Sequence, residues 1–266
     1  MTIPGPLRDR LTELGSVLVA YSGGVDSTYL AFAAHRLLGP RSMAAIADSA
    51  SLPRAELDDA LAQADEAGFP LHSVRTREFD SDEYLRNAPD RCFHCKEALF
   101  DELFPLAAGL GLGHVALGTV TDDLGDTRPG LTSARNRGAV QPLLEAGLSK
   151  ADVRELAREE GLRAWDKPQA ACLSSRIPHG TPVTLEALGA VERAEEAVRA
   201  LGIRQVRVRH HGERASVEVG HEDLEQVRSE PLRSQVVHAV GGAGYLEVDI
   251  DPRGYRTGVR LPVIRG

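Results

Sequence analysis

The sequence is poor in the features that mark secreted, membrane-spanning and nucleic-acid-coating proteins. Its three cysteines are too few, and odd in number, for a disulfide framework. No uninterrupted apolar run approaches the roughly 18 residues of a membrane span, and Met1 to Arg10 contains no apolar core of a secretory signal. Lys and Arg number 31 against 39 Asp and Glu, so the formal net charge is −8. We therefore expect a cytoplasmic protein without a general attraction to nucleic acid or membrane.

The chain does have enough apolar sequence for a folded core. Hydrophobic residues make up 42% of its 266 positions, a length that suits one large domain or two of modest size. Apolar runs at 16–21, 43–47, 71–74 and 114–117 predict buried parallel strands, because such strands are covered on both faces. Helical patterns occur at 5–14, 26–38, 53–68 and 95–110. This alternation predicts an α/β domain over 1–181, Rossmann-like with a parallel sheet.

The pattern changes after about Pro178. Residues 185–201 predict one amphipathic helix. Residues 204–209 and 214–219 then alternate around His211-Gly212, which predicts an antiparallel hairpin, and 245–250 offers one more strand. We expect a second, smaller α+β domain over 182–266.

The strongest functional signal is Ser22-Gly23-Gly24-Val25-Asp26-Ser27, between the first strand and the next helix. Glycines let backbone N–H groups approach a phosphate, and the helix N-terminus adds positive charge. Ser22, Ser27 and Thr28 add hydroxyl donors, and no Lys follows the glycines as in a Walker loop. The loop resembles the SGGxDS loop of the PP-loop ATP pyrophosphatases, which cleave ATP between its α and β phosphates. A glycine turn capped by Asp or Ser is the alternative.

A group of carboxylates follows the strand at 114–117. Gly118 ends that strand, and Asp122, Asp123 and Asp126 come shortly after it. Carboxylates at the carboxyl edge of a parallel sheet are placed to hold Mg²⁺ on bridging phosphates. The alternative is that they are turn and helix-capping residues.

Cys92, Cys95 and Cys172 form a C-x-x-C pair and a distant third thiol. Three thiols can ligate a [4Fe–4S] cluster and leave one iron open to hold an extra sulfide. They can also bind zinc with His94 or water, act as a redox dithiol, or be small buried residues.

Cys172 lies in 165–180, a segment with Pro and Gly at both ends, which indicates an ordered loop. Arg176 and Lys167 flank the thiol and would lower its pKa, which favours the nucleophilic thiolate. Solvated surface charges are the alternative.

Together these motifs resemble the LarE family. The resemblance rests on the loop 22–27, Gly118-Thr119 with Asp122-Asp123, Leu124-Gly125-Asp126 with Arg128-Pro129-Gly130, Cys172-Leu173-Ser174-Ser175-Arg176, and Gly254-Tyr255-Arg256. It covers roughly residues 15–260 in order. It implies an ATP-dependent sulfur transferase in nickel-pincer cofactor synthesis. That chemistry adenylates each carboxylate of pyridinium-3,5-biscarboxylic acid mononucleotide, and sulfur then displaces AMP to leave a thiocarboxylate. The residues expected to bind ATP and Mg²⁺ are Ser22, Gly23, Gly24, Asp26, Ser27, Thr28, Gly118, Asp122 and Asp123.

Members of this family differ in their sulfur source. Some sacrifice the sulfur of a single cysteine in the C-L-[SA]-S-R loop, which becomes dehydroalanine. Others also carry C-x-x-C and are similar to cluster-dependent thiolases. This chain has the three-cysteine pattern, which favours a [4Fe–4S] cluster as sulfur carrier. The catalytic candidates are Asp26, Cys172 and Arg176.

Three arginines in the second domain are candidates for binding the mononucleotide. Arg207 and Arg209 project from one face of their predicted strand, and Arg214 returns on its partner. Guanidinium pairs suit a phosphate or a carboxylate. A solvated strand face is the alternative.

Other functions fit parts of the sequence. A PP-loop tRNA thiolase needs a basic face for RNA, which a chain of net charge −8 does not suggest. A non-catalytic ATP-binding module would not need the loop 172–176. An amidotransferase-type synthetase needs an ammonia-supplying domain, for which we expect no room in 266 residues. The favoured interpretation has a small nucleotide substrate, no nucleic-acid or membrane partner, and a homo-oligomeric state. A sulfide-supplying partner is left open.

Overall fold

The computed structural model describes residues 3–125, 129–168 and 171–256. The chain divides into two compact units: Met1–Ser81 with Asp90–Ala170, and Asp82–Pro89 with Ala171–Gly266. The first unit is α/β with an all-parallel sheet and the second is α+β with a mixed sheet, so the predicted fold class is confirmed. Within the described residues, no helix is long and apolar enough to cross a membrane.

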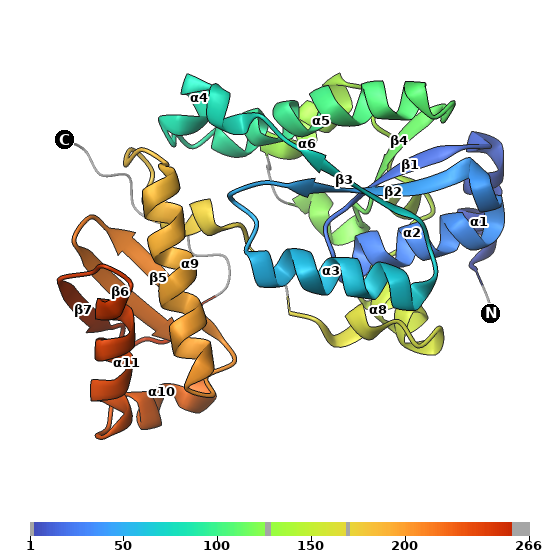
Figure 1. Cartoon of the computed structure of the whole chain (residues 1–266). Helices are drawn as coiled ribbons and strands as arrows, with labels where there is room; N and C mark the ends of the chain where they lie inside the picture. The colour runs from blue at the N-terminus through green and yellow to red at the C-terminus, as the bar shows by residue number, and fades with distance from the viewer. Residues whose placement is uncertain (1–2, 126–128, 169–170, 257–266) are drawn as a thin grey trace. The chain divides into compact units, whose positions relative to one another are not determined.

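The sheet of the first unit has four parallel strands in the order β3-β2-β1-β4 (Figure 1). They are β1 (Val17–Tyr21), β2 (Ser42–Asp48), β3 (Leu71–Arg75) and β4 (His114–Leu117). The central strand β1 pairs with β2 on one side and with β4 on the other. The strand order reverses there, and ligands of open α/β sheets bind beyond the carboxyl ends of strands at such a point.

Helices cover both faces of this sheet. The bounds of the helices are α1 (Gly5–Leu14), α2 (Val25–Leu38), α3 (Arg54–Ala67), α5 (Arg91–Gly109), α6 (Pro129–Asn136), α7 (Pro142–Glu145) and α8 (Lys150–Glu159). Val17 and Val19 pack in the core shared with α1, α2, α3 and α8, whereas Leu18 packs with α5 on the opposite face (Figure 1). Neighbouring side chains of a strand point to opposite faces, so β1 needs a continuous apolar run.

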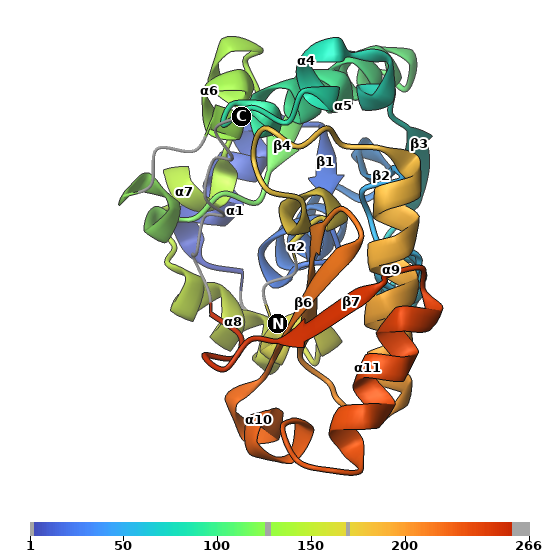
Figure 2. The same ribbon diagram turned by 90° about the vertical axis from the view of Figure 1, so that its left-hand side faces the viewer.

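The second unit has a three-stranded sheet, formed by β5 (Val206–His211), β6 (Arg214–Val219) and β7 (Glu247–Ile250). β5 and β6 form the predicted antiparallel hairpin, and β7 pairs with β6 in parallel. Val206, Val208 and Val217 share one core with α9 (Leu185–Ala200) and α11 (Leu232–Gly242), which lie side by side in Figure 2. Helix α10 (His221–Val227) completes this side. The opposite face of the sheet carries Arg207, Arg209 and Glu218.

The second unit begins at Ala171, earlier than the boundary at 182 suggested by the sequence. It also takes in the short helix α4 (Asp82–Leu85). The reason is a polar anchor: the fully buried side chain of Asn87 donates to the carbonyls of Pro178 at 2.8 Å and Thr181 at 2.7 Å. The Tyr84 hydroxyl hydrogen-bonds that of Ser174 at 2.7 Å. These bonds join residues 82–89 to residues 174–181 and so include them in the second unit.

Candidate active site

The predicted phosphate loop connects β1 to α2, as the sequence indicated. Gly24 is the N-cap of α2, and Gly23 has a φ of 71°. A Cβ at Gly23 would lie 2.8 Å from Cβ of Ala60 on α3. Both the backbone conformation and the packing therefore require glycine at this position.

The hydroxyl groups of the loop hold the loop itself. Ser27 Oγ accepts from the backbone N–H of Ser22 at 3.1 Å, lies 3.1 Å from Ser22 Oγ, and donates to the Gly24 carbonyl at 3.1 Å. Thr28 Oγ1 donates to the same carbonyl at 2.9 Å. Ser27 and Thr28 are buried while Ser22 is exposed. Ser27 and Thr28 thus pre-organise the turn, and Ser22 is the hydroxyl that faces solvent.

The end of β4 closes on this loop at Gly118. A Cβ there would lie 2.8 Å from the backbone N of Ser27 and 2.9 Å from the carbonyl carbon of Asp26. Only glycine permits that approach of backbone to backbone. Two motifs far apart in the sequence are in this way brought to one sheet edge.

Asp26 and Asp122 are joined by a lysine that the sequence reasoning missed. Lys150 Nζ lies 2.8 Å from Asp26 Oδ2, and the Lys150 backbone N–H donates to Asp122 Oδ2 at 2.8 Å. Asp123 instead accepts from the N–H of Val120 at 3.1 Å, the capping role considered as its alternative. Asp126 and Arg128 lie outside the described residues. Lys150 stands at the start of an amphipathic helix, and no local pattern signals its partner.

A second oxygen of Asp26 is available for a cation. Asp26 Oδ1 is buried and has no hydrogen-bond partner among the described residues. Carboxylate oxygens at the carboxyl edge of a parallel sheet are the ligands that Mg²⁺ prefers. Asp26 therefore fits the role of a magnesium ligand. Asp122 is held near Asp26 because both carboxylates bind Lys150.

The cysteines occupy accessible positions, and all three carry thiols rather than disulfides. Cys92 and Cys95 lie near the start of α5, where a spacing of three puts both on one helix face. Cys92 and Cys172 are exposed, and Cys172 is the N-cap of a 3₁₀ turn, Leu173–Arg176. Accessible thiolates suit iron–sulfur ligation. Among the described residues no group of three or more His, Cys, Asp and Glu is arranged to hold a metal ion.

Lys167 binds acidic residues of α3. Its Nζ lies 2.6 Å from Asp59 Oδ2 and 2.8 Å from Glu56 Oε2. Burial works to lower the pKa of Lys167, but the two carboxylates outweigh it and the pKa is raised. The ammonium group is therefore neither a solvated surface charge nor directed to a thiol.

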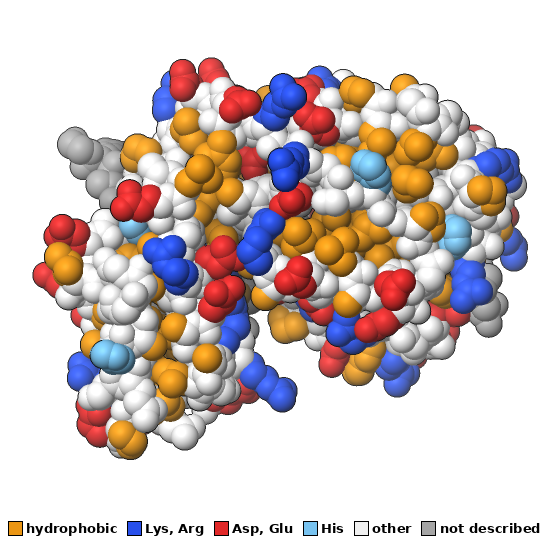
Figure 3. All heavy atoms as spheres, in the orientation of Figure 1, with side chains coloured by type: hydrophobic (Ala, Val, Ile, Leu, Met, Phe, Trp, Pro, Cys, Tyr) orange, Lys and Arg blue, Asp and Glu red, His pale blue; other side chains and the backbone are white. Residues whose placement is uncertain are grey.

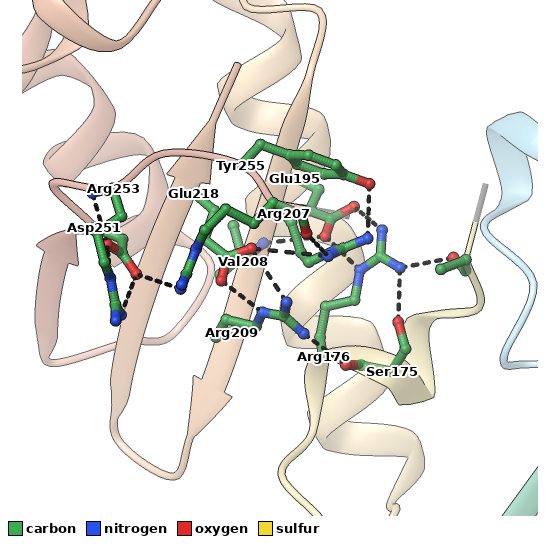
Figure 4. Close-up of polar contacts among 12 residues, drawn as sticks. Ser175, Arg176, Glu195, Arg207, Val208, Arg209, Glu218, Asp251, Arg253 and Tyr255 are labelled. Carbon is green, nitrogen blue, oxygen red and sulfur yellow. Dashed lines mark hydrogen bonds and ion pairs between the residues drawn. The ribbon is translucent and has the colours of Figure 1, made fainter. Parts of the chain in front are cut away.

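Arg176 is buried and fixes the backbone around Cys172. Its Nε and Nη2 donate to Glu195 on α9 at 2.8 and 3.1 Å, and its Nη1 donates to the carbonyls of Ala171 at 2.7 Å and Cys172 at 3.1 Å (Figure 4). Burial acts to lower the pKa of Arg176, yet its pairing with Glu195 raises it. The guanidinium group stays charged and positions the cysteine.

Arg209 makes a similar set of contacts from β5. It donates to both carboxylate oxygens of Glu218, at 2.9 and 3.2 Å, and to the carbonyl of Ser175 at 2.9 Å. Only 3% of Arg209 is exposed, so the alternative of a solvated strand face is wrong for this residue. Figure 4 shows Arg209 reaching from β5 to Ser175, which lies in the same 3₁₀ turn as Arg176.

Arg207 lies under the tyrosine of the Gly-Tyr-Arg motif. Its guanidinium lies 4.3 Å from the ring centroid of Tyr255, and Nη2 donates to the Tyr255 hydroxyl at 2.7 Å. Burial, together with the neighbouring charges of Arg209 and Arg176, lowers the pKa of Arg207. Its Nε is buried without a partner among the described residues. Arg214, by contrast, is exposed and pairs with Asp249.

The fold and the loop define a PP-loop type of nucleotide-binding α/β protein. No family model matches the chain. It is 42% identical over 252 residues to the uncharacterized protein slr1717 of Synechocystis, covering 95% of this chain and 94% of that protein. It is 34% identical over 250 residues to pyridinium-3,5-bisthiocarboxylic acid mononucleotide synthase of Lactiplantibacillus plantarum, covering 93% and 90%. A subunit of the glutamine-hydrolyzing GMP synthase of Methanocella arvoryzae is 28% identical over 211 residues, which cover 69% of this chain and 61% of that subunit. The chain belongs to the LarE family.

Proposed function

We propose that this chain is an ATP-dependent sulfur transferase that converts carboxylates of pyridinium-3,5-biscarboxylic acid mononucleotide into thiocarboxylates. The observation that carries the proposal is the nucleotide site of the first unit. There a buried carboxylate oxygen of Asp26 has no partner among the described residues, and the backbone of Asp26 and Ser27, at the N-terminus of α2, packs against Gly118. The relative from Lactiplantibacillus plantarum supplies the substrate class through its name.

The first reaction is adenylation. A substrate carboxylate oxygen attacks the α-phosphorus of ATP, the bond from that phosphorus to the bridging oxygen breaks, and pyrophosphate leaves. Backbone N–H groups at the start of α2 bind the phosphates, and Asp26 with Asp122 would hold Mg²⁺, which withdraws charge from the phosphate oxygens. The rigid turn made by Ser27 and Thr28 keeps these donors in place.

The second reaction is sulfur transfer. A sulfide nucleophile attacks the acyl carbon, the carbon–oxygen bond to AMP breaks, and the proton of hydrogen sulfide goes to solvent. A [4Fe–4S] cluster held by Cys92, Cys95 and Cys172 would carry that sulfide on its open iron. Arg176 donates to the carbonyl of Cys172, and Arg209 donates to the carbonyl of Ser175. These hydrogen bonds fix the backbone that carries the Cys172 thiol.

The arginines of β5 divide the work of substrate binding. Arg207 has an Nε without a partner among the described residues, and burial together with the charges of Arg209 and Arg176 lowers its pKa, although Glu218 lies 3.8 Å away. An anion would relieve both conditions, so we assign the phosphate of the mononucleotide to Arg207. Arg209 acts as a positioning residue for the Cys172 segment through its bond to Ser175. Arg214, at the exposed end of the same sheet face, contacts the mononucleotide.

The proposal is tested by following nucleotide products. With substrate, Mg²⁺ and ATP present, we expect AMP and pyrophosphate in equal amounts. Release of ADP and phosphate would contradict an adenylating mechanism. ATP binding without turnover would instead support a nucleotide-binding module.

A further inference from the structure

We propose that Lys150 is the phosphate-binding cation of the nucleotide site, and that it exchanges Asp26 for a phosphate oxygen when Mg²⁺ and ATP bind. The inference rests on the proposed use of ATP. It concerns a residue outside the glycine loop, since residues 22–28 contain neither Lys nor Arg. The cation comes instead from the start of α8, 124 residues after Asp26.

The backbone of Lys150 is anchored beside the loop. Ser149 is the N-cap of α8, and its side chain and that of Asp152 form a reciprocal capping box. The Lys150 N–H donates to Asp122 at 2.8 Å. These bonds fix the root of the side chain, so only its flexible stem needs to move for the ammonium group to change partner.

The ion pair with Asp26 places the ammonium group at the mouth of the loop. Nζ lies 2.8 Å from Asp26 Oδ2, and the two side chains are 33% and 18% exposed. A ligand can therefore reach the pair from solvent. Mg²⁺ is a hard divalent cation that takes carboxylate oxygens. Once bound at Asp26 Oδ1, which has no partner among the described residues, its charge would repel the ammonium group held on Oδ2. The displaced charge then meets the phosphates, which lie at the same helix N-terminus.

Charge balance favours this exchange. Asp26 and Asp122 are both acidic, and a nucleoside triphosphate brings further negative charge close to them. Mg²⁺ offsets part of this, and a cation freed from Asp26 offsets more. A lysine is suited to the task, because its ammonium group is a point charge with rotatable donors on a flexible stem.

The test uses the fact that the chain has only three lysines, Lys96, Lys150 and Lys167. The whole protein is acetylated with an N-hydroxysuccinimide ester, and each lysine is followed by mass spectrometry. We expect Mg²⁺ alone to speed acetylation of Lys150, because Asp26 releases it. At ten times the dissociation constant of Mg²⁺–ATP, the rate at Lys150 should fall about tenfold, as the unbound fraction does. Lys96 is the internal reference and should not change.

A pair of variants separates phosphate binding from a structural ion pair. Lys150→Met should weaken binding of Mg²⁺–ATP about tenfold to a hundredfold through loss of one charge-assisted contact, and Lys150→Arg should restore most of it. Binding is measured by calorimetry, and thermal unfolding checks both variants. Should Lys150→Met not fold, acetylation of the wild-type protein and binding by Lys150→Arg still decide the matter.

Two outcomes overturn the inference. If ATP binds by calorimetry while acetylation of Lys150 stays constant, Lys150 is only the structural partner of Asp26 and the proposed function stands. If ATP does not bind to the wild-type protein, the proposed function fails and this inference fails with it.

Discussion

Asp26 and Arg209 show how differently two charged side chains are used in this protein. Both carboxylate oxygens of Glu218 accept hydrogen bonds from Arg209, and the third guanidinium nitrogen donates to the carbonyl of Ser175. Asp26 binds Lys150 through one oxygen and keeps the other unpartnered among the described residues. A polar atom left unpaired in a buried place costs stability. An unpaired buried atom such as Asp26 Oδ1 therefore indicates a ligand-binding role, whereas a fully paired side chain such as Arg209 indicates a structural role.

We expect Asp26→Asn to abolish formation of AMP and pyrophosphate while the protein stays folded. The amide keeps the shape of the side chain but loses the charge that would hold Mg²⁺, so the rate should fall about a hundredfold or more. Pyrophosphate release measures the loss, and circular dichroism checks the fold. A wild-type rate in the folded variant would remove Asp26 from the mechanism.

We expect Arg209→Ala to destabilise the second unit strongly and Arg214→Ala to have little effect on its stability. Removing Arg209 takes away both of its hydrogen bonds to Glu218, which keeps only the longer ion pair with Arg207 at 3.8 Å. The loss of stability should therefore approach the roughly 3–5 kcal/mol that breaking a buried pair costs. The exposed pair of Arg214 and Asp249 contributes about 0–1 kcal/mol. Denaturant unfolding compares the two variants. Equal stability losses would show that Arg209 is not the structural residue inferred from its contacts.

Among the elements, β1 and α2 were predicted well because local sequence determines them. The apolar run before Ser22 predicted a strand buried on both faces, and the observed strand Val17–Tyr21 lies between β2 and β4. Gly24 and Val25 then start α2 one residue before the expected position. Helix α5 was predicted to start at Cys95 and starts at Arg91, so the C-x-x-C pair lies inside the helix.

Tertiary contacts account for what the sequence did not reveal. Nothing near Lys150 indicates that its ammonium group reaches Asp26, because the two belong to different elements. The alternation of β5 placed Arg207 and Arg209 on one face, as found, but could not show that this face is buried. Burial there depends on Ser175 and Tyr255, which come from segments on either side of the hairpin.

Gly118 is the position where β4 contacts the start of α2, and it gives a test at the scale of elements. We expect Gly118→Ala to impair ATP binding and to lower stability, because the new Cβ would lie 2.8 Å from the backbone N of Ser27. Gly109→Ala is the matched control, since a Cβ at Gly109 meets nothing within 4 Å. Calorimetry with ATP and thermal unfolding compare them. Identical behaviour of both variants would contradict the close approach.

For the whole molecule, charge and length bear on the rival functions. On the face shown in Figure 3, Lys and Arg side chains are intermixed with Asp and Glu. The formal net charge of −8 does not favour an RNA-binding thiolase. Chain length weighs less against an amidotransferase-type synthetase than the sequence alone suggested, because one relative is itself named as a separate subunit of a GMP synthase.

Cys92, Cys95 and Cys172 are predicted to act as one group of ligands. If Cys92, Cys95 and Cys172 ligate a cluster, replacing any one of them by Ala should cause loss of the bound iron and abolish sulfur transfer. Adenylation should be unaffected. Iron and sulfide are measured after anaerobic purification, and adenylation by pyrophosphate release. Dehydroalanine at Cys172 after one turnover, with Cys92→Ala still active, would show instead that Cys172 sacrifices its own sulfur.

Coupling of ATP cleavage to sulfur transfer is tested most directly in a single anaerobic reaction. The protein is mixed with Mg²⁺–ATP, sulfide and pyridinium-3,5-biscarboxylic acid mononucleotide, and one sample is analysed for nucleotides and for substrate mass. We predict that each exchange of a carboxylate oxygen for sulfur is accompanied by one AMP and one pyrophosphate. Thiocarboxylate formed without AMP, or AMP formed while the substrate keeps all its oxygens, would contradict the proposed function.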